Sequence, residues 1–125
     1  MSNEKKFVGT CVSCTDEDDV LTIGVGDDDS DPENFFIIGR FDEDDLSVDE
    51  CIGFQSDATE YEIAGAVASV TLDKNVITVS LHQHAADKTG ISQYSADISS
   101  TENLTELKEY LRDIFDGSKA NLVIR

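Results

Sequence analysis

The hydrophobic side chains of this chain recur mostly at every second position, and this spacing restricts the fold more than any other feature. The clearest case is the pair of segments Ala66 to Leu72 and Val76 to His82, which a short polar turn separates. In the second segment Ile77, Val79 and Leu81 alternate with polar residues, so one face is predicted to be core and the other solvated. The pattern predicts an antiparallel hairpin.

Other short apolar segments, each bounded by charged or turn-forming residues, also predict strands. The run Phe35 to Ile38 is apolar throughout, which indicates a strand buried on both faces or lying under a helix. The tail from Ala120 to Ile124 is apolar enough for a last strand or a docked extension. The remaining predicted strands are Lys6 to Ser13, Val20 to Val25, Cys51 to Gln55 and Ile91 to Ile98.

The hydrophobic period changes near residue 100, where apolar residues begin to recur at steps of three and four. This spacing predicts an amphipathic helix over residues 100–116. Ser99 with Glu102 offers a capping box, and Gly117 marks the end of the helix. We therefore expect an α+β fold, a mostly antiparallel sheet of six to eight strands with one C-terminal amphipathic helix packed on it. The apolar positions of the helix are Leu104, Leu107, Leu111 and Ile114.

The length and hydrophobic content suit one compact domain over residues 1–125, because 39% of the 125 residues are hydrophobic and the mean hydropathy is −0.26. No stretch approaches the roughly 20 apolar residues that cross a bilayer. Met1 to Lys6 are polar, with no apolar core behind them. We therefore expect a cytoplasmic protein without a membrane partner.

Three cysteines, Cys11, Cys14 and Cys51, cannot all pair within the chain, which favours reduced thiols in the cytosol. Cys11 and Cys14 have the C-x-x-C spacing of zinc and redox sites. They lie in a predicted strand, however, with no second such pair and no helix after them. Small side chains in or near the core are the preferred interpretation, so no metal or cofactor is expected.

Charge carries the most functional information. The chain holds 27 acids and nine bases, a formal net charge of −18. Residues 1–62 contain 19 of the acids and three bases, whereas residues 63–125 contain eight acids and six bases. The early acids form three runs between apolar stretches, which places them in loops that can pool their charge into one patch. The runs are Asp16, Glu17, Asp18 and Asp19; Asp27, Asp28 and Asp29 with Asp31 and Glu33; and Asp42, Glu43, Asp44 and Asp45 with Asp49 and Glu50.

An electrostatic field of this sign repels nucleic-acid phosphates and anionic lipids, so neither is expected as a partner. The same field attracts a cationic protein surface, such as the substrate groove of a nuclease, with fast and salt-sensitive association. The alternative interpretation is that the acids keep the protein soluble or reflect a salty habitat.

A calcium loop is a further interpretation of the acidic residues. Asp27, Asp29 and Asp31 stand at alternate positions, as the first ligands of an EF-hand do. Pro32, however, stands where the loop glycine belongs, and Ile38 where the bidentate glutamate belongs. Weak, opportunistic cation binding is the preferred interpretation.

The sequence shows no catalytic motif, and no enzymatic activity is expected. His82 and His84 are candidates for a metal site because alternate residues of a strand point the same way. They stand at the outward end of the hairpin without further ligands, which favours a solvent-facing strand end. Gly24-x-Gly26 precedes three aspartates, which repel a phosphate, and no serine lies in G-x-S-x-G.

The segment from Cys51 to Gly117 has a characteristic order of short motifs. They are Ile52-Gly53-Phe54-Gln55, Tyr61-Glu62-Ile63, Ala68-x-Val70-x-Leu72, Val76-x-Thr78-x-Ser80-Leu81 and the apolar helix that ends at Gly117. In this order the segment resembles family 10 of the immunity proteins of bacterial polymorphic toxin systems. The resemblance implies an intracellular antidote that binds a toxin domain and blocks it stoichiometrically, without a catalytic residue.

We expect the three acidic runs to form the face that contacts a basic toxin, with Phe41 or Tyr61 as apolar anchors. Two alternatives stay open. One is a structural or assembly protein that pairs as a homodimer through an exposed sheet edge. The other is a metal-binding module that uses the three cysteines and the two histidines.

Overall fold

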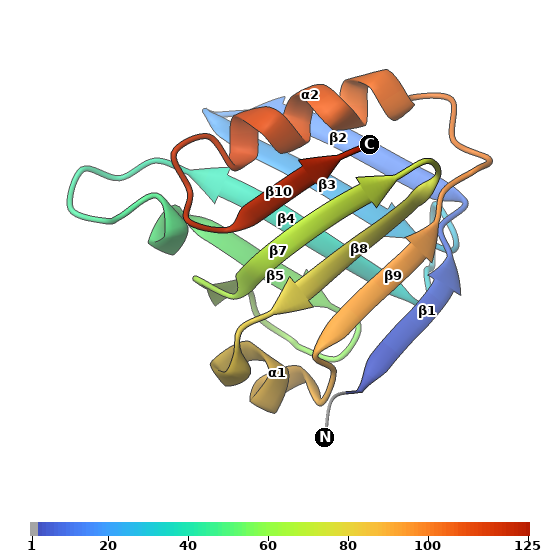
Figure 1. Cartoon of the computed structure of the whole chain (residues 1–125), viewed down its shortest axis with the longest axis horizontal. Coiled ribbons are helices and arrows are strands. Elements are labelled where there is room, and N and C mark those ends of the chain that lie inside the picture. Colours follow the sequence, from blue (N-terminus) through green and yellow to red (C-terminus); the bar gives the residue numbers. More distant parts are fainter. Residues whose placement is uncertain (1–2) are drawn as a thin grey trace.

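The computed structural model describes residues 3–125, which form ten strands in two sheets and two α-helices (Figure 1). Met1 and Ser2, which begin the predicted 1–125 domain, lie outside the described residues. Sheet A contains, in spatial order, β1 (Glu4–Val8), β9 (Gln93–Asp97), β8 (Val76–Leu81), β7 (Val67–Asp73) and β10 (Asn121–Ile124). Sheet B contains β2 (Cys11–Glu17), β3 (Val20–Gly26), β4 (Phe35–Phe41), β5 (Ile52–Ser56) and β6 (Ile63–Ala64). The helices are α1 (Gln83–Thr89) and α2 (Leu104–Ile114), and a 3₁₀ turn, η1, covers Asp49–Cys51.

Sheet B is antiparallel throughout, whereas sheet A is mixed, because β1 pairs with β9 and β10 pairs with β7 in parallel. The expectation of one mostly antiparallel sheet with one helix is therefore wrong in its details. An α+β description fits roughly, since the described residues are mostly β with two helices. The predicted hairpin is confirmed as β7 and β8.

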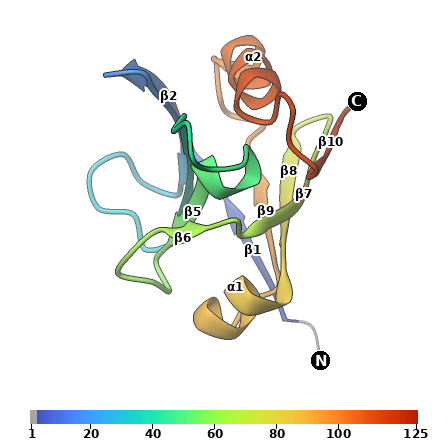
Figure 2. The same cartoon turned by 90° about the vertical axis from the view of Figure 1, so that its left-hand side faces the viewer.

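The two sheets face each other as layers, and their strands cross at a steep angle (Figure 1). Figure 2 shows α2 along the open side between the edge strands β2 and β10; the helix contacts both, together with β3. Inward-facing side chains from both sheets and α2 form one apolar cluster. Its largest fully buried members are Tyr94, Phe36, Phe54, Ile23, Ile38, Leu72, Ile77, Ile98, Leu107, Leu111 and Ile114.

Tyr94 of β9 joins the two sheets at the centre of this core. Its ring centroid lies 5.1 Å from that of Phe54 and 6.2 Å from that of Phe36, both in sheet B. Its hydroxyl forms a buried hydrogen bond of 2.8 Å with Ser56 Oγ. The pairing matters because a buried hydroxyl without a partner is destabilising.

Gly9 is the point at which the chain leaves sheet A and enters sheet B. The sequence predicted one strand from Lys6 to Ser13, but this segment is divided between β1 and β2, which belong to different sheets. Gly9 is buried, and a Cβ added there would lie 2.7 Å from Val25 Cγ1 and 3.1 Å from Ile98 Cγ2. Side chains from both layers thus close on a position that has room only for hydrogen.

Arg40 of β4 holds the C-terminal end of α2. Its Nη1 donates hydrogen bonds shared among the carbonyl oxygens of Asp113 (3.1 Å), Ile114 (3.0 Å) and Asp116 (2.8 Å). The last carbonyls of a helix have no partner within the helix and carry partial negative charge, which a guanidinium satisfies. Nε of Arg40 also donates to Asp42 Oδ1 at 2.8 Å, and the Arg40 side chain is only 14% exposed.

The start of α2 differs from the prediction, whereas its end agrees. The helix begins after Asn103, so the predicted capping box at Ser99 is wrong. Asn103 donates to the carbonyl oxygen of Val12 in β2 at 3.0 Å, which ties the helix start to sheet B. Gly117 follows the helix end with a φ of 79°, a conformation that glycine adopts without strain.

Helix α1 was not predicted. The strand expected to run to His82 ends at Leu81, and His82 is instead the residue before α1. Ala85 is the buried residue of α1, so the segment shows no apolar stripe in the sequence. Within residues 3–125, neither helix has the length and apolar character needed to span a bilayer.

Gly9→Ala is expected to lower the free energy of unfolding by about 1–3 kcal/mol, because an overpacked core displaces neighbouring side chains. Equilibrium unfolding in urea measures the change. Asn121→Ala, at an exposed position of β10, is the control and should alter stability by less than about 0.5 kcal/mol. A Gly9→Ala protein as stable as the wild type would contradict the steric restriction at the corner.

Arg40→Met should destabilise the protein by about 1–3 kcal/mol, because it leaves partly buried carbonyl oxygens without a donor. Arg112→Met removes the same charge from an exposed position of α2 and should cost less than about 1 kcal/mol. Urea midpoints of the two variants give the comparison. Equal losses would mean that charge at the helix end matters and the hydrogen bonds of Arg40 do not.

Candidate partner-binding surface

Sheet B and its loops carry most of the negative charge of the protein. Residues 11–64, which form this sheet, contain eighteen acids and one base, Arg40. Because Arg40 is engaged at the end of α2, the described part of this segment presents acids to solvent without an exposed base. The residues of sheet B and its loops therefore carry a large excess of negative charge.

The outer face of sheet A differs in composition. Its central strands present mostly neutral side chains between the core positions, and the other eight bases belong to sheet A, the helices or the loops beside them. Charge is therefore distributed by face rather than evenly around the molecule. The outward residues of β9, β8 and β7 include Gln93, Ser95, Thr78, Ser80, Ser69 and Thr71.

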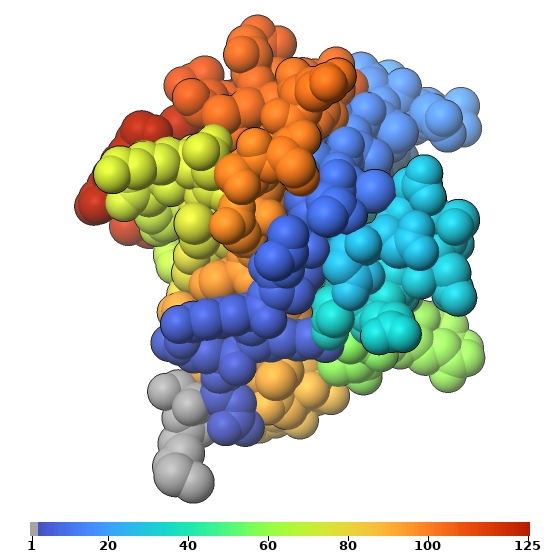
Figure 3. All heavy atoms as spheres, turned by 90° about the vertical axis from the view of Figure 1, so that its right-hand side faces the viewer, coloured from blue at the N-terminus to red at the C-terminus, as the bar shows by residue number. Residues whose placement is uncertain are grey.

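The three acidic runs do not meet in one loop cluster. Because β2 to β5 are consecutive antiparallel strands, their connections alternate between the two ends of sheet B. Residues 16–19 and 42–50 lie at one end, and residues 27–33 lie at the other (Figure 1). Figure 3 shows the cyan loop of residues 27–33 and the lighter blue β2–β3 turn as separate projections. The single patch expected from the sequence is therefore divided into two.

The first run, residues 16–19, forms the end of β2 and a tight turn. Asp18 and Asp19 have φ values of 53° and 65°, and positive φ at both central residues is what a type I′ hairpin turn requires. Asp16 and Glu17 are the last paired residues of β2. All four side chains are exposed.

The third run, residues 42–50, is partly used for structure. Asp42 is paired with Arg40. Burial alone would raise the pKa of Asp49, but hydrogen bonds from Ser118 and Lys119 outweigh it and hold this pKa below its usual value. Asp49 thus ties η1 to the loop after α2. The exposed acids of this run, without an ion pair among the described residues, are Glu43, Asp44, Asp45 and Glu50, the last of which accepts hydrogen bonds from Ser47.

Asp27 in the second run is also structural. Its Oδ2 accepts a hydrogen bond from Asn34 Nδ2 and its Oδ1 accepts one from the Glu33 amide, both at 2.9 Å. These bonds lower the pKa of Asp27 below its usual value, that from Asn34 most. Thr10 Oγ1 donates to the Asp27 carbonyl at 2.9 Å, which joins the loop to the start of β2. The Asp27 carboxylate therefore holds the loop closed.

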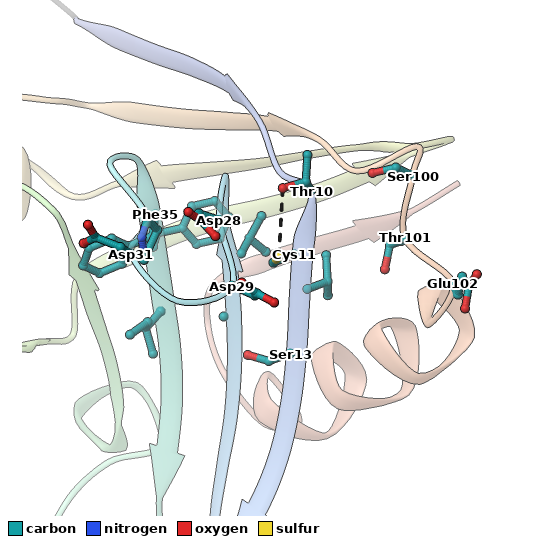
Figure 4. Close-up of a pocket in the computed structure, with 17 residues that line it drawn as sticks. Thr10, Cys11, Ser13, Asp28, Asp29, Asp31, Phe35, Ser100, Thr101 and Glu102 are labelled. Atoms are coloured by element: carbon teal, nitrogen blue, oxygen red, sulfur yellow. Dashed lines mark hydrogen bonds between the residues drawn. The ribbon is translucent and has the colours of Figure 1, made fainter.

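A groove of about 810 Å³ lies on the outer face of sheet B, beside this loop (Figure 4). Asp28, Asp29 and Asp31 line one side of it, and Ser100, Thr101 and Glu102 line the other. Of its seventeen lining residues four are acids and none is basic. The other lining residues are Thr10, Cys11, Val12, Ser13, Gly24, Val25, Gly26, Pro32, Phe35, Phe36 and Ile37.

Two glycines of β3 form the floor of the groove. The register sets Ser13, Gly24 and Ile37 in one row across three strands, and Cys11, Gly26 and Phe35 in the next. Since alternate strand residues point to the same face, both glycines stand on the outer face, between flanking side chains. The sequence signal for this floor is the spacing Gly24-x-Gly26 at the end of the predicted strand Val20 to Val25. Phe35 and Ile37 on this outer face are half-buried, whereas Phe36 and Ile38 are fully buried, so the expected burial of this strand is complete on the inner face only.

The two predicted apolar anchors do not line the groove. Phe41 pairs with Val20, at the end of sheet B that carries residues 16–19, and is partly buried. Tyr61 is 75% exposed and lies in the loop between β5 and β6. The neighbouring Glu62 covers Gly53, where an added Cβ would collide with its carboxyl group, and burial raises the pKa of Glu62. Phe41 and Tyr61 therefore lie in different parts of sheet B and its loops and do not form one apolar cluster.

The two cysteines of the C-x-x-C pair face opposite sides of β2. Cys14 is in register with the buried Ile23 and faces inward, whereas Cys11 is in register with Gly26 and faces the groove. Burial, together with the negative charge of Glu106, raises the pKa of the Cys14 thiol to about 11. Cys51 is buried in η1. The described residues show no group of three or more histidine, cysteine or acidic side chains able to hold a metal ion.

The two histidines stand where β8 turns into α1. Their rings are stacked with centroids 6.3 Å apart, and both residues are exposed. His84 belongs to the first turn of α1, with a ring nitrogen 3.4 Å from the Ala64 carbonyl oxygen. We expected the two histidines at a solvent-facing strand end. They are exposed, but they lie at the start of α1 instead.

Comparison with known proteins identifies a family. A family model described as immunity protein 10 matches residues 8–105, which is more than half of the chain. The match includes all of sheet B and every residue that lines the groove. It therefore begins well before Cys51, where the resemblance found in the sequence begins. No curated protein matches the chain.

Asp27→Asn should destabilise the protein at pH 7 and reduce the dependence of stability on pH. A carboxyl group whose pKa is lowered by folding stabilises the protein above its unfolded pKa of about 3.9, and this contribution disappears as the pH falls through the folded pKa. The stability difference between wild type and variant should therefore narrow below about pH 4. Urea midpoints over a pH series measure it. Asp29→Asn, an exposed neighbour, should stay within about 0.5 kcal/mol of wild type at pH 7.

Proposed function

This chain belongs to the immunity protein 10 family, and we propose that it binds a cognate toxin of a bacterial polymorphic toxin system and neutralises it. The toxin surface it covers is basic. The proposed place of action is the cytoplasm, and no catalytic residue is assigned. Neutralisation requires only that the bound protein excludes the substrate of the toxin.

The observation that carries this proposal is the distribution of charge. If the acids served solubility alone, they would be useful on every exposed face. Instead, residues 11–64 carry eighteen of the 27 acids, and their one base is engaged by α2. This excess of negative charge over sheet B favours encounter with a cationic partner.

The proposed contact residues are the acids of the three runs together with the two aromatic side chains. Carboxylates at both ends of sheet B steer the toxin into contact. In the complex, carboxylates that enter the cationic groove of the toxin occupy the places where the phosphates of the toxin's substrate would bind. Asp27 and Asp42 act mainly by holding their loops in place. The proposed set is Asp16, Glu17, Asp18, Asp19, Asp27, Asp28, Asp29, Asp31, Asp42, Glu43, Asp44, Asp45, Phe41 and Tyr61.

A homodimer is the second candidate, and one observation favours it. Val8 and Val76 are 58% and 41% exposed, and the register places them in one row of sheet A, either side of Asp97. β1 is an edge strand, so this corner offers both apolar surface and free backbone groups. Light scattering measures whether the isolated protein is a dimer, and mixing with the toxin domain measures whether it binds. A dimer that does not bind the toxin would favour the homodimer as the functional form.

Changing Glu43, Asp44 and Asp45 to their amides should slow association with the toxin domain encoded beside this protein, by roughly 3- to 10-fold at low salt. Changing Asp28, Asp29 and Asp31 to asparagine should slow the association to a similar extent. Each variant should also show a weaker dependence of the association rate on salt. Stopped-flow mixing measures the rates, and growth of cells that express the toxin measures protection.

The matched control removes three charges from sheet A and α1, at Glu4, Asp73 and Asp87. It should leave the association rate within about twofold of wild type, because these side chains belong to another face. Equal slowing by all three variants would show that only net charge matters. Unaltered rates in the two sheet B variants would refute recognition through the acidic surface.

A further inference from the structure

We infer that the groove on the outer face of sheet B receives an arginine side chain of the toxin, an inference that rests on the proposed function. The groove would hold the aliphatic part of this side chain against β3 and its guanidinium between the loop of residues 27–33 and the segment 100–102. This assigns the central contact to one end of sheet B.

The shape of the groove comes from two successive outward positions without side chains. Gly24 and Gly26 line the groove in β3, in register with Ser13 and Cys11 on one side and with Ile37 and Phe35 on the other. Figure 4 shows Cys11, Ser13 and Phe35 around this part of the groove. A Cβ on Gly24 would lie 2.9 Å from Ser13 Oγ, so any side chain there would occupy the groove. Glycine is unfavourable in a strand and is found where another chain approaches the backbone closely.

The charge of the groove determines its occupant. Asp28, Asp29, Asp31 and Glu102 line it, and none of the four forms an ion pair among the described residues. Phosphate or a carboxylate would be repelled. A cation placed between these walls gains attraction from carboxylates on both sides, so the groove is complementary to a positive side chain.

The spacing of these carboxylates favours an extended cation over a metal ion. No three acidic, histidine or cysteine side chains within residues 3–125 converge closely enough to bind a metal. A guanidinium is planar, donates five N–H bonds and is weakly hydrated, so it can engage acids that stand apart. Phe35 and Pro32 add apolar surface on which an arginine stem can pack.

The other acidic end of sheet B lacks this combination. Asp42 there is already neutralised by Arg40, and Asp18 and Asp19 occupy a tight turn. Its remaining exposed acids contribute to long-range attraction, which raises the association rate more than it slows dissociation. The two ends are thus expected to affect different rate constants.

The first experiment titrates the protein with the peptide acetyl-Gly-Arg-Gly-amide and follows backbone amide signals by NMR. The amides of Gly24, Gly26 and Phe35 should shift and saturate with a dissociation constant of about 1–10 mM. The same peptide with citrulline, a neutral analogue of arginine, should shift them at least about fivefold less, because the charge is lost. Equal shifts at residues 43–45, or equal effects of the two peptides, would overturn the inference.

The second experiment fills the groove with Gly24→Val. Valine suits a strand and Ser13 Oγ can rotate away, so thermal unfolding should stay close to wild type. Binding of the toxin domain should weaken at least about tenfold, mainly through faster dissociation, and Gly24→Ala should show a smaller loss. Asn121→Val on sheet A, an equivalent exposed strand position, is the control and should bind normally.

The outcomes separate the two proposals. If the wild type binds the toxin and folded Gly24→Val binds it equally well, the groove inference is wrong while the proposed function stands. If the wild type does not bind the toxin but the peptide titration succeeds, the proposed function fails and the groove remains a site for cations. If Gly24→Val does not fold, Gly24→Ala and the peptide titration decide.

Discussion

The hydrogen bonds between Arg40 and the end of α2 connect the architecture of this protein to its surface charge. They fix the helix over the open side between the sheets, where its apolar residues complete the core. They also remove the one base of residues 11–64 from the acidic face. A guanidinium is suited to this place because it stays charged when largely buried and can serve several carbonyl oxygens at once. One interaction thus stabilises the fold and leaves residues 11–64 without an exposed base of their own.

The groove depends on register as much as on composition. Gly24 and Gly26 form a floor only because β2 and β4 set larger side chains on either side of them. A slip of one residue would turn both glycines inward and remove the groove. The register is held by the alternating core residues of the same strand, Ile23 and Val25, which are buried against sheet A and α2. Core packing therefore positions a surface feature on the opposite face of the strand.

Much of the secondary structure was predictable, because a period of two or of 3.6 residues is a local property. The β7–β8 hairpin and α2 were found in this way. The bend at Gly9 was missed because the alternation of residues continues across it, and only contacts with Val25 and Ile98 show why the chain must turn there. Helix α1 was missed because it buries one alanine and so leaves no apolar stripe.

The sequence alone determined that negative charge is concentrated in its first half and that the chain resembles an immunity protein, since both follow from the order of residues. Only the tertiary structure decided where each carboxylate lies. It divided the acidic runs between two ends of sheet B, gave Asp27 a role within its loop, and placed Asp29 in the lining of a groove on the outer face of that sheet. The reason is that strand pairing and the alternation of turns join residues far apart in the chain, and no run of charges records which partners it will meet.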